Sequence, residues 1–167
     1  MTSGQRLPKG LSRLALFSVT MGGLGLLRPA SGSWGSLPPV ALALLIVWSG
    51  APWWVLDVSL ALTVVFATIA CVKFGKLAEE AFGAKDPSSV VADETAGCAV
   101  TLLAVPWWMI ATGDSNALVR TAIVCATGFF FFRLFDVWKP GYVGDLQSQP
   151  HGWGIVLDDL AAGAWAW

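Results

Sequence analysis

Long stretches without a charged residue constrain this chain more than any other feature. Residues 29–56, 58–72 and 95–113 contain no Asp, Glu, Lys or Arg, and residues 121–132 are uncharged within an apolar run from Ala117. A charge at the centre of a bilayer costs at least about 2.5–3.5 kcal/mol on insertion scales, so such intervals mark membrane helices. We predict helices at 38–50, 53–73, 95–112 and 117–138, and a fifth, shorter apolar segment at 154–167.

Composition excludes several classes of protein. Hydrophobic residues make up 56% of the 167 residues and charged residues 13%, whereas soluble domains carry about 25% charged residues. The net charge of −1 argues against a nucleic-acid-binding surface. Three cysteines without metal-site spacing lie in apolar stretches, so no disulfide framework is expected. We therefore predict one all-α domain over residues 1–167, a polytopic membrane bundle of about four to five membrane helices.

Two short connections set the orientation of these helices. Residues 49–52 and 113–116 have turn composition, so each closes a helical hairpin. Every Lys and Arg except Arg120 then lies on one side, with the N-terminus, residues 73–94 and residues 133–153. By the positive-inside bias this side is the cytoplasm. Most of the acidic residues follow, which predicts a polar site at the cytoplasmic face.

The N-terminal segment, residues 1–36, partly resembles a signal peptide, because basic residues precede an apolar stretch at 14–27. Gly22-Gly23 thins that stretch, and Arg28 interrupts the approach to any cleavage site. We expect an interfacial or re-entrant segment instead.

The first acidic motif contains Asp86-Pro87 and Asp93-Glu94. Asp is favoured as an N-cap and Pro in the first turn, so we predict that the third helix begins at Asp86. Asp86 and Asp93 would then lie two turns apart on one face, with Glu94 about 100° round. A solvated turn beside the membrane explains the same residues equally simply.

The second motif is Arg133, Asp136 and Lys139, spaced three residues apart at the end of a Phe-rich helix. This spacing allows the three side chains to share a face. They are either ligands for an anion or membrane anchors with Asp136 as their ion-pair partner.

The third motif is Asp158-Asp159, which lies inside an apolar run. Adjacent carboxylates in a helix entering lipid are costly unless a cation or partner compensates them. His151, seven residues before Asp158, is the single histidine of the chain and is either a site residue or a structural group.

Together the motifs call for a cation and an anion at one membrane face. Carboxylate oxygens suit Mg²⁺, which commonly bridges carboxylates to phosphate, so phosphoryl chemistry is our interpretation. Residues 31–36, Ser-Gly-Ser-Trp-Gly-Ser, fit this interpretation because backbone N–H groups at a glycine-rich helix start can bind phosphate. The same glycines also suit an ordinary loop.

These motifs follow one another in a recognisable order. They are Gly32-Ser33-Trp34-Gly35-Ser36; Asp86, Asp93-Glu94 and Gly97; Phe132-Arg133-Leu134-Phe135-Asp136 with Lys139-Pro140; and His151-Gly152-Trp153-Gly154 with Asp158-Asp159 and Ala162-Gly163. From about residue 13 to the end, the chain resembles the phosphatidylglycerophosphatase A family. The resemblance implies a Mg²⁺-dependent lipid phosphatase in the bacterial inner membrane, which converts phosphatidylglycerophosphate to phosphatidylglycerol and inorganic phosphate. Three departures are Ser33, where Thr is common, Pro87-Ser88, which varies the usual loop, and a tail that stops eight residues after Asp159.

Site residues can be carried over from the resemblance. We predict a catalytic group of Asp86, Asp93, Glu94, Asp136, Asp158 and Asp159, in which Asp93, Glu94, Asp158 and Asp159 hold Mg²⁺. We assign substrate phosphate binding to Arg133, Lys139, Ser33, Gly35, Ser36 and His151. The nucleophile stays open between a metal-bound water and an Asp carboxylate. Asp86 is a candidate for a general base or for a residue supporting the metal ligands.

The alternative function is a small transporter or channel with an acidic cytoplasmic gate. The predicted helices 95–112 and 117–138 weigh against it, because they carry almost no polar group at mid-depth, where a translocation path needs them.

Overall fold

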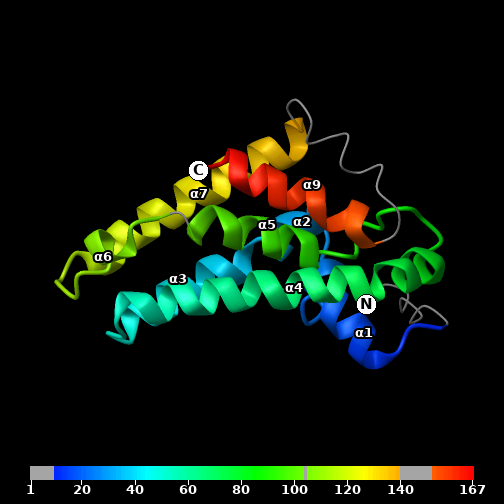
Figure 1. Cartoon of the computed structure of the whole chain (residues 1–167), viewed down its shortest axis with the longest axis horizontal. Helices are drawn as coiled ribbons and strands as arrows, with labels where there is room; N and C mark the ends of the chain where they lie inside the picture. The colour runs from blue at the N-terminus through cyan, green and yellow to red at the C-terminus, as the bar shows by residue number, and fades with distance from the viewer. Residues whose placement is uncertain (1–9, 104, 140–151) are drawn as a thin grey trace.

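The computed structural model describes residues 10–103, 105–139 and 152–167, and every regular element in these ranges is a helix (Figure 1). The elements are α1 (Arg13–Val19), η1 (Leu24–Leu26), α2 (Ser31–Gly35), α3 (Leu37–Trp48), α4 (Trp53–Phe82), α5 (Ala92–Leu103), α6 (Trp107–Ile110), α7 (Ala117–Trp138) and α9 (Gly152–Trp165). The all-α class is confirmed for the described part of the chain.

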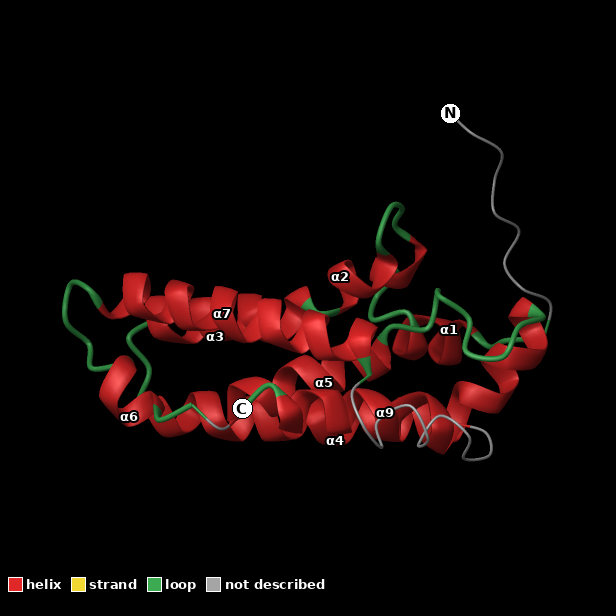
Figure 2. Ribbon diagram, turned by 90° about the horizontal axis from the view of Figure 1, so that it is seen from above, coloured by secondary structure: helices red, strands yellow, loops and turns green. Residues whose placement is uncertain are grey.

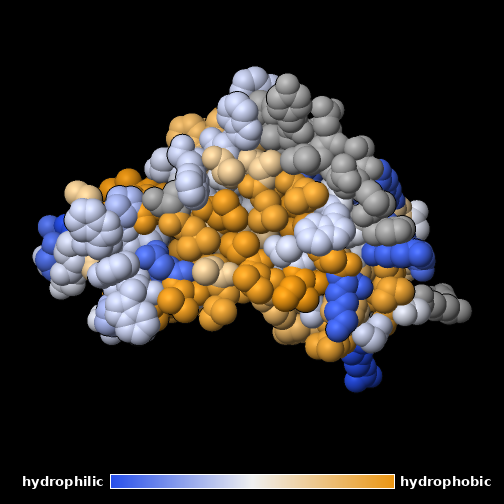
Figure 3. All heavy atoms as spheres, in the orientation of Figure 1, coloured by the Kyte–Doolittle hydropathy of each residue, from blue (hydrophilic) through white to orange (hydrophobic). Residues whose placement is uncertain are grey.

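Three segments are long and apolar enough to cross a membrane: Ser31–Trp48, Trp53–Phe82 and Ala117–Trp138. Figure 3 shows hydrophobic residues over the middle of the visible face and hydrophilic residues towards both ends of the long axis. This distribution suits a protein that spans a bilayer. A total of four to five membrane helices stays a prediction.

Helix α5 lies in the middle of the helix bundle (Figure 2). Figure 2 shows α3 and α7 along one side of the molecule and α4 and α9 along the other, with α5 between them. Close approach in the centre depends on glycine, because a Cβ on Gly163 would overlap the backbone of Gly97. Since α5 and α9 have 12 and 14 residues, they reach only about 18 and 21 Å at 1.5 Å per residue.

The prediction of one helix over residues 95–112 is wrong. Helix α5 ends at Leu103 and α6 begins only at Trp107. Pro106 explains the break, because proline has no N–H and disfavours a helical conformation in the residue before it. The indole N–H of Trp107 donates to the carbonyl of Leu102 at 2.9 Å, which fixes the two pieces relative to one another.

The predicted helix start at Asp86 is also wrong. Asp86 has φ +50°, outside the right-handed helical region. The backbone N–H of Val91 donates to the carbonyl of Val19 at 2.9 Å instead of joining a helical ladder. The chain thus pairs with the end of α1 before α5 begins at Ala92. Asp86 and Asp93 do not share a helical face.

Helix α4 extends beyond its predicted end at residue 73. Lys76 and Glu80 lie one turn apart with their charged atoms 4.0 Å from one another, and the helix ends where Gly83 adopts φ +71°. The apolar stretch therefore stops before the helix does.

In the N-terminal segment, α1 has seven residues and exposes Leu14 and Phe17. Its interfacial or re-entrant character stays a prediction.

Candidate active site

Three carboxylates from two helices form the centre of the site. Asp93 and Glu94 lie in the first turn of α5, and Asp159 lies in α9. One oxygen from each lies within 4.8 Å of the other two, and Asp93 and Asp159 are buried. A helix N-terminus favours negative charge in its first turn, which helps to stabilise Asp93 and Glu94.

Glycine allows these helices to approach closely. A Cβ on Gly97, one turn after Asp93, would lie 2.5 Å from the carbonyl oxygen of Asp159 and would overlap the ring of Phe132. Any other residue at 97 would therefore push α9 and α7 away from α5. Gly97 is a positioning residue for the carboxylates of α5 and α9.

Two cations border the cluster. The Nη1 atom of Arg133 lies 2.5 Å from the Oδ2 atom of Asp136, one turn along α7. An ion pair, one of the two interpretations of this motif, therefore forms between Arg133 and Asp136. Lys139 instead pairs with Asp158 of α9, because it lies just beyond the end of α7 with φ +47°.

Negative charge is in excess here. Five carboxylates lie with two cations, and their residues are Asp93, Glu94, Asp136, Asp158 and Asp159 against Arg133 and Lys139. Burial is the main cause that raises the pKa of Asp93 well above its usual range and that of Glu94 to about 7. Both residues lie outside the three candidate membrane spans. Burial therefore opposes ionisation unless a further positive charge is supplied.

Several buried carboxylate oxygens accept no hydrogen bond from the described residues. They are Oδ1 of Asp93, Oε2 of Glu94, Oδ1 of Asp158 and Oδ2 of Asp159. A buried acceptor without a partner is costly, and a hard divalent cation satisfies oxygens of this kind. The carboxylates of Asp93, Glu94 and Asp159 could therefore hold a metal ion.

The glycine-rich segment forms the short helix α2 and contacts the same cluster. A Cβ on Gly32 would lie 2.9 Å from both terminal nitrogens of Arg133 and would also overlap Glu94. The hydroxyl of Thr95 donates to the carbonyl of Gly35 at 2.6 Å, which fixes α2 to the start of α5. Sequence reasoning missed Thr95, whose hydroxyl comes directly after Asp93-Glu94.

The other predicted phosphate-binding residues differ in their surroundings. Ser33 is half-buried. Gly35 packs against Val91, and the buried hydroxyl of Ser36 donates to the carbonyl of Gly32 at 2.8 Å. The N–H of Asp86 donates to Glu79 at 3.4 Å, and Asp86 lies outside the group of three carboxylates. His151 lies outside the described residues.

Comparisons with known proteins agree on a family. The model of the family "Phosphatidylglycerophosphatase A" matches residues 17–167. A phosphatidylglycerophosphatase A of Escherichia coli is 30% identical over 142 residues, covering 84% of this chain and 72% of that protein. One of Haemophilus influenzae is 28% identical over 161 residues, covering 93% and 85%.

A Bacteroides thetaiotaomicron protein, provisionally named as a phosphatidylinositol-3-phosphatase, is 31% identical over 133 residues, covering 76% of this chain and 70% of that protein. No solved structure matches the chain. The family model covers the whole site described above, from Gly32 to Asp159. The chain belongs to the phosphatidylglycerophosphatase A family.

Proposed function

We propose that this protein is a Mg²⁺-dependent membrane phosphatase that hydrolyses the terminal monoester of phosphatidylglycerophosphate. In the net reaction the bond from phosphorus to the glycerol oxygen breaks and one water is consumed: its oxygen ends on phosphorus, one of its protons ends on the glycerol oxygen, and phosphatidylglycerol and inorganic phosphate leave. The observation that carries the proposal is the buried cluster of Asp93, Glu94 and Asp159 with unpartnered oxygens beside two cations. Family membership identifies the lipid.

Asp93, Glu94 and Asp159 would hold the metal ion, and Asp158 stands next to them with one oxygen unpartnered. When bound, Mg²⁺ supplies Lewis-acid polarisation of a phosphoryl oxygen and lowers the pKa of a bound water. The carboxylates of the chain fix its position. Asp136 pairs with Arg133 and orients that guanidinium.

Arg133 and Lys139 would bind the substrate's phosphates. A guanidinium offers two parallel N–H donors to a phosphate, and an ammonium offers a compact charge. The substrate carries a terminal monoester and an internal diester, so two cations are a suitable complement. Ser33, Gly35, Ser36, His151 and Asp86 remain the further proposed members of the site.

We place the site at the cytoplasmic face of the bacterial inner membrane. Nine of the ten Lys and Arg residues fall on the side of the carboxylates, as the positive-inside bias requires. Single cysteines at Ser88 and Asn116, in a variant lacking the native three, should label from the cytoplasm and from outside, respectively. Outside labelling at Ser88 would overturn this orientation, and labelling of one position from both sides would favour the transporter.

The decisive test is phosphate release by the purified protein in detergent during a Mg²⁺ titration. Phosphatidylglycerophosphate should be hydrolysed in preference to phosphatidic acid and phosphatidylinositol 3-phosphate. The last lipid tests the activity named for the Bacteroides thetaiotaomicron relative. Release from none of the three lipids would return the interpretation to the transporter.

A further inference from the structure

An apolar groove opens between the carboxyl-terminal parts of α5 and α9 and the middle of α7. Its volume is about 330 Å³, and small-molecule sites typically measure about 300–1,000 Å³. Its walls include Thr101 of α5, Gly128 and Phe131 of α7, and Ala166 and Trp167 at the end of the chain. Residues of the C-terminus and of α7 thus face one another across the groove.

The polar groups around the groove are already bonded within the protein. The hydroxyl of Thr101 lies 3.2 Å from the carbonyls of Gly97 and Gly163, and that of Thr127 lies 2.9 Å from the carbonyl of Ile123. The indole N–H of Trp167 donates to Val100. The two threonines therefore leave only their methyl groups to contact a ligand, and hydrocarbon is the chemistry that fits this surface.

The same three helical segments carry both the groove residues and the carboxylates. Each of three helical segments carries a site carboxylate and a groove residue seven or eight positions apart: Asp93 and Thr101, Gly128 and Asp136, and Asp159 and Ala166. Residues seven apart lie on one face and residues eight apart lie about 80° round, in both cases about two turns, or 10–12 Å, along the helix at 1.5 Å per residue. The groove therefore lies about two helical turns from the carboxylates, a separation that matches the distance from a lipid headgroup to the start of its tails.

The groove is also open to the surroundings. Ile123 and Phe131, both in its wall, are 61% and 41% exposed, and both belong to the candidate span α7. A lipid tail can therefore enter sideways from the bilayer while its headgroup stays at the polar face.

We propose that this groove binds one acyl chain of the lipid substrate and thereby sets the height of the phosphate monoester at the carboxylates. The proposal rests on the proposed function. Lipid tails are as apolar as the groove, so packing and position, not transfer from water, provide the selectivity.

Filling the groove tests this role. In Thr127→Trp and Ala166→Leu, the KM for a phosphatidylglycerophosphate with two 18-carbon chains should rise roughly three- to tenfold, since packing in lipid contributes modestly. The KM for the analogue with two six-carbon chains should change less than twofold. Val119→Trp is the matched control, because Val119 is 59% exposed on α7 and does not line the groove. In Val119→Trp, the KM for each substrate should match that of the unaltered protein.

Equal changes for long and short chains, or no change for either, would overturn the groove assignment while leaving the phosphatase intact. Absence of activity towards both lipids in the unaltered protein would instead refute the proposed function. A long-chain substrate with a diazirine in one tail gives a readout without turnover. Its crosslinks should fall in residues 123–131 and be competed by unlabelled substrate. Crosslinks only elsewhere, or exclusion of the tail from the groove by a second copy of the chain, would contradict the proposal.

Discussion

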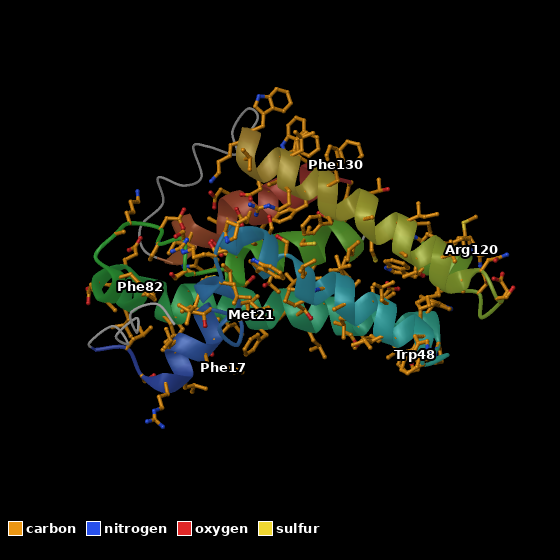
Figure 4. All side chains as sticks on the ribbon, turned by 180° about the vertical axis from the view of Figure 1, so that it is seen from behind. Phe17, Met21, Trp48, Phe82, Arg120 and Phe130 are labelled. Atoms are coloured by element: carbon orange, nitrogen blue, oxygen red, sulfur yellow. The ribbon has the colours of Figure 1, made fainter. Side chains whose placement is uncertain are left out.

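Two groups of ion pairs lie towards opposite ends of α7, and they differ in whether their charges are matched. At the first, Asp114 accepts hydrogen bonds from the hydroxyl of Thr112 at 2.9 Å, the N–H of Asn116 at 2.8 Å and the guanidinium of Arg120 at 2.8 Å. One carboxylate meets one cation, and both are substantially exposed. Figure 4 labels Arg120 at this end of the molecule.

At the other end, Arg133 and Lys139 face five carboxylates, and four of the buried oxygens lack a partner among the described residues. The first group pairs its carboxylate with one cation and two further donors. The second leaves buried oxygens without a partner, and a further cation could satisfy them. The two groups therefore differ in charge balance and in satisfied acceptors, not in residue type.

The largest expected effect comes from removing one carboxylate of the second group. Asp93→Asn keeps the size of the side chain and removes its charge. Because a metal contributes several kcal/mol to such a reaction, phosphate release should fall by about 10²–10³-fold or more. Helix content should stay the same by circular dichroism. Asp114→Asn is the matched control, and near-normal activity of Asp93→Asn at ordinary Mg²⁺ would remove Asp93 from the site.

Metal binding should also be visible as stability. At 100 times its dissociation constant, a ligand that binds only the folded state stabilises it by about 2.7 kcal/mol. Thermal melts in detergent should therefore shift upwards with Mg²⁺ in the unaltered protein and in Asp114→Asn, and a chelator should reverse the shift. Asp159→Asn should lose most of it. A shift of equal size in Asp159→Asn would place the metal elsewhere.

A smaller effect is expected for the cation on α7. Charge-assisted hydrogen bonds contribute about 1.5–3 kcal/mol, so Arg133→Ala should lower kcat/KM by roughly 10- to 100-fold. Arg133→Lys should recover part of this loss, because it restores charge without the planar pair of donors. The measurement is a full kinetic profile beside a thermal melt. Unchanged kinetics with lower stability would make Arg133 a membrane anchor only.

The sequence predicts the spanning helices well because lipid leaves few alternatives. The predicted 117–138 and the observed Ala117–Trp138 coincide, and the predicted 38–50 matches Leu37–Trp48 closely. A backbone in hydrocarbon must satisfy its own hydrogen bonds, so a long uncharged run favours a helix. The prediction misses the last turns of α4 because charged residues end the apolar run there but do not end the helix.

Local sequence signals predict the wrong structure where contacts between distant residues determine it. Asp86-Pro87 has the composition of a helix start, yet the N–H of Val91 donates to the carbonyl of Val19, 72 residues earlier, and α5 begins only at Ala92. The pairing of Lys139 with Asp158 likewise joins two helices and cannot follow from spacing within one. By contrast, the break before α6 has a visible cause in Pro106. The prediction of one helix fails here because it considers residues 95–113 only as an uncharged run and gives Pro106 no weight.

The smallest effect concerns the pH dependence of the matched group. The hydrogen bonds that Asp114 accepts lower the pKa of its carboxyl from 3.8 to about 2, and the bond from Arg120 has the largest effect. A depressed folded-state pKa gives stability that is present above the unfolded pKa, near pH 4, and is lost as the pH falls towards 2. Since exposed pairs contribute little, the unaltered protein should melt only slightly above Asp114→Asn at pH 5 and 6.

That difference should vanish as the pH falls to 2 and should shrink in high salt, because exposed charges are screened. Melts in detergent from pH 2 to 6 measure it, with phosphate release at pH 7 as the control that should not change. A melting difference that persists at pH 2 would show that Asp114 acts through packing and not through its charge. A loss of activity in Asp114→Asn would be more serious, because it would mean that a cluster with every acceptor satisfied still takes part in the reaction.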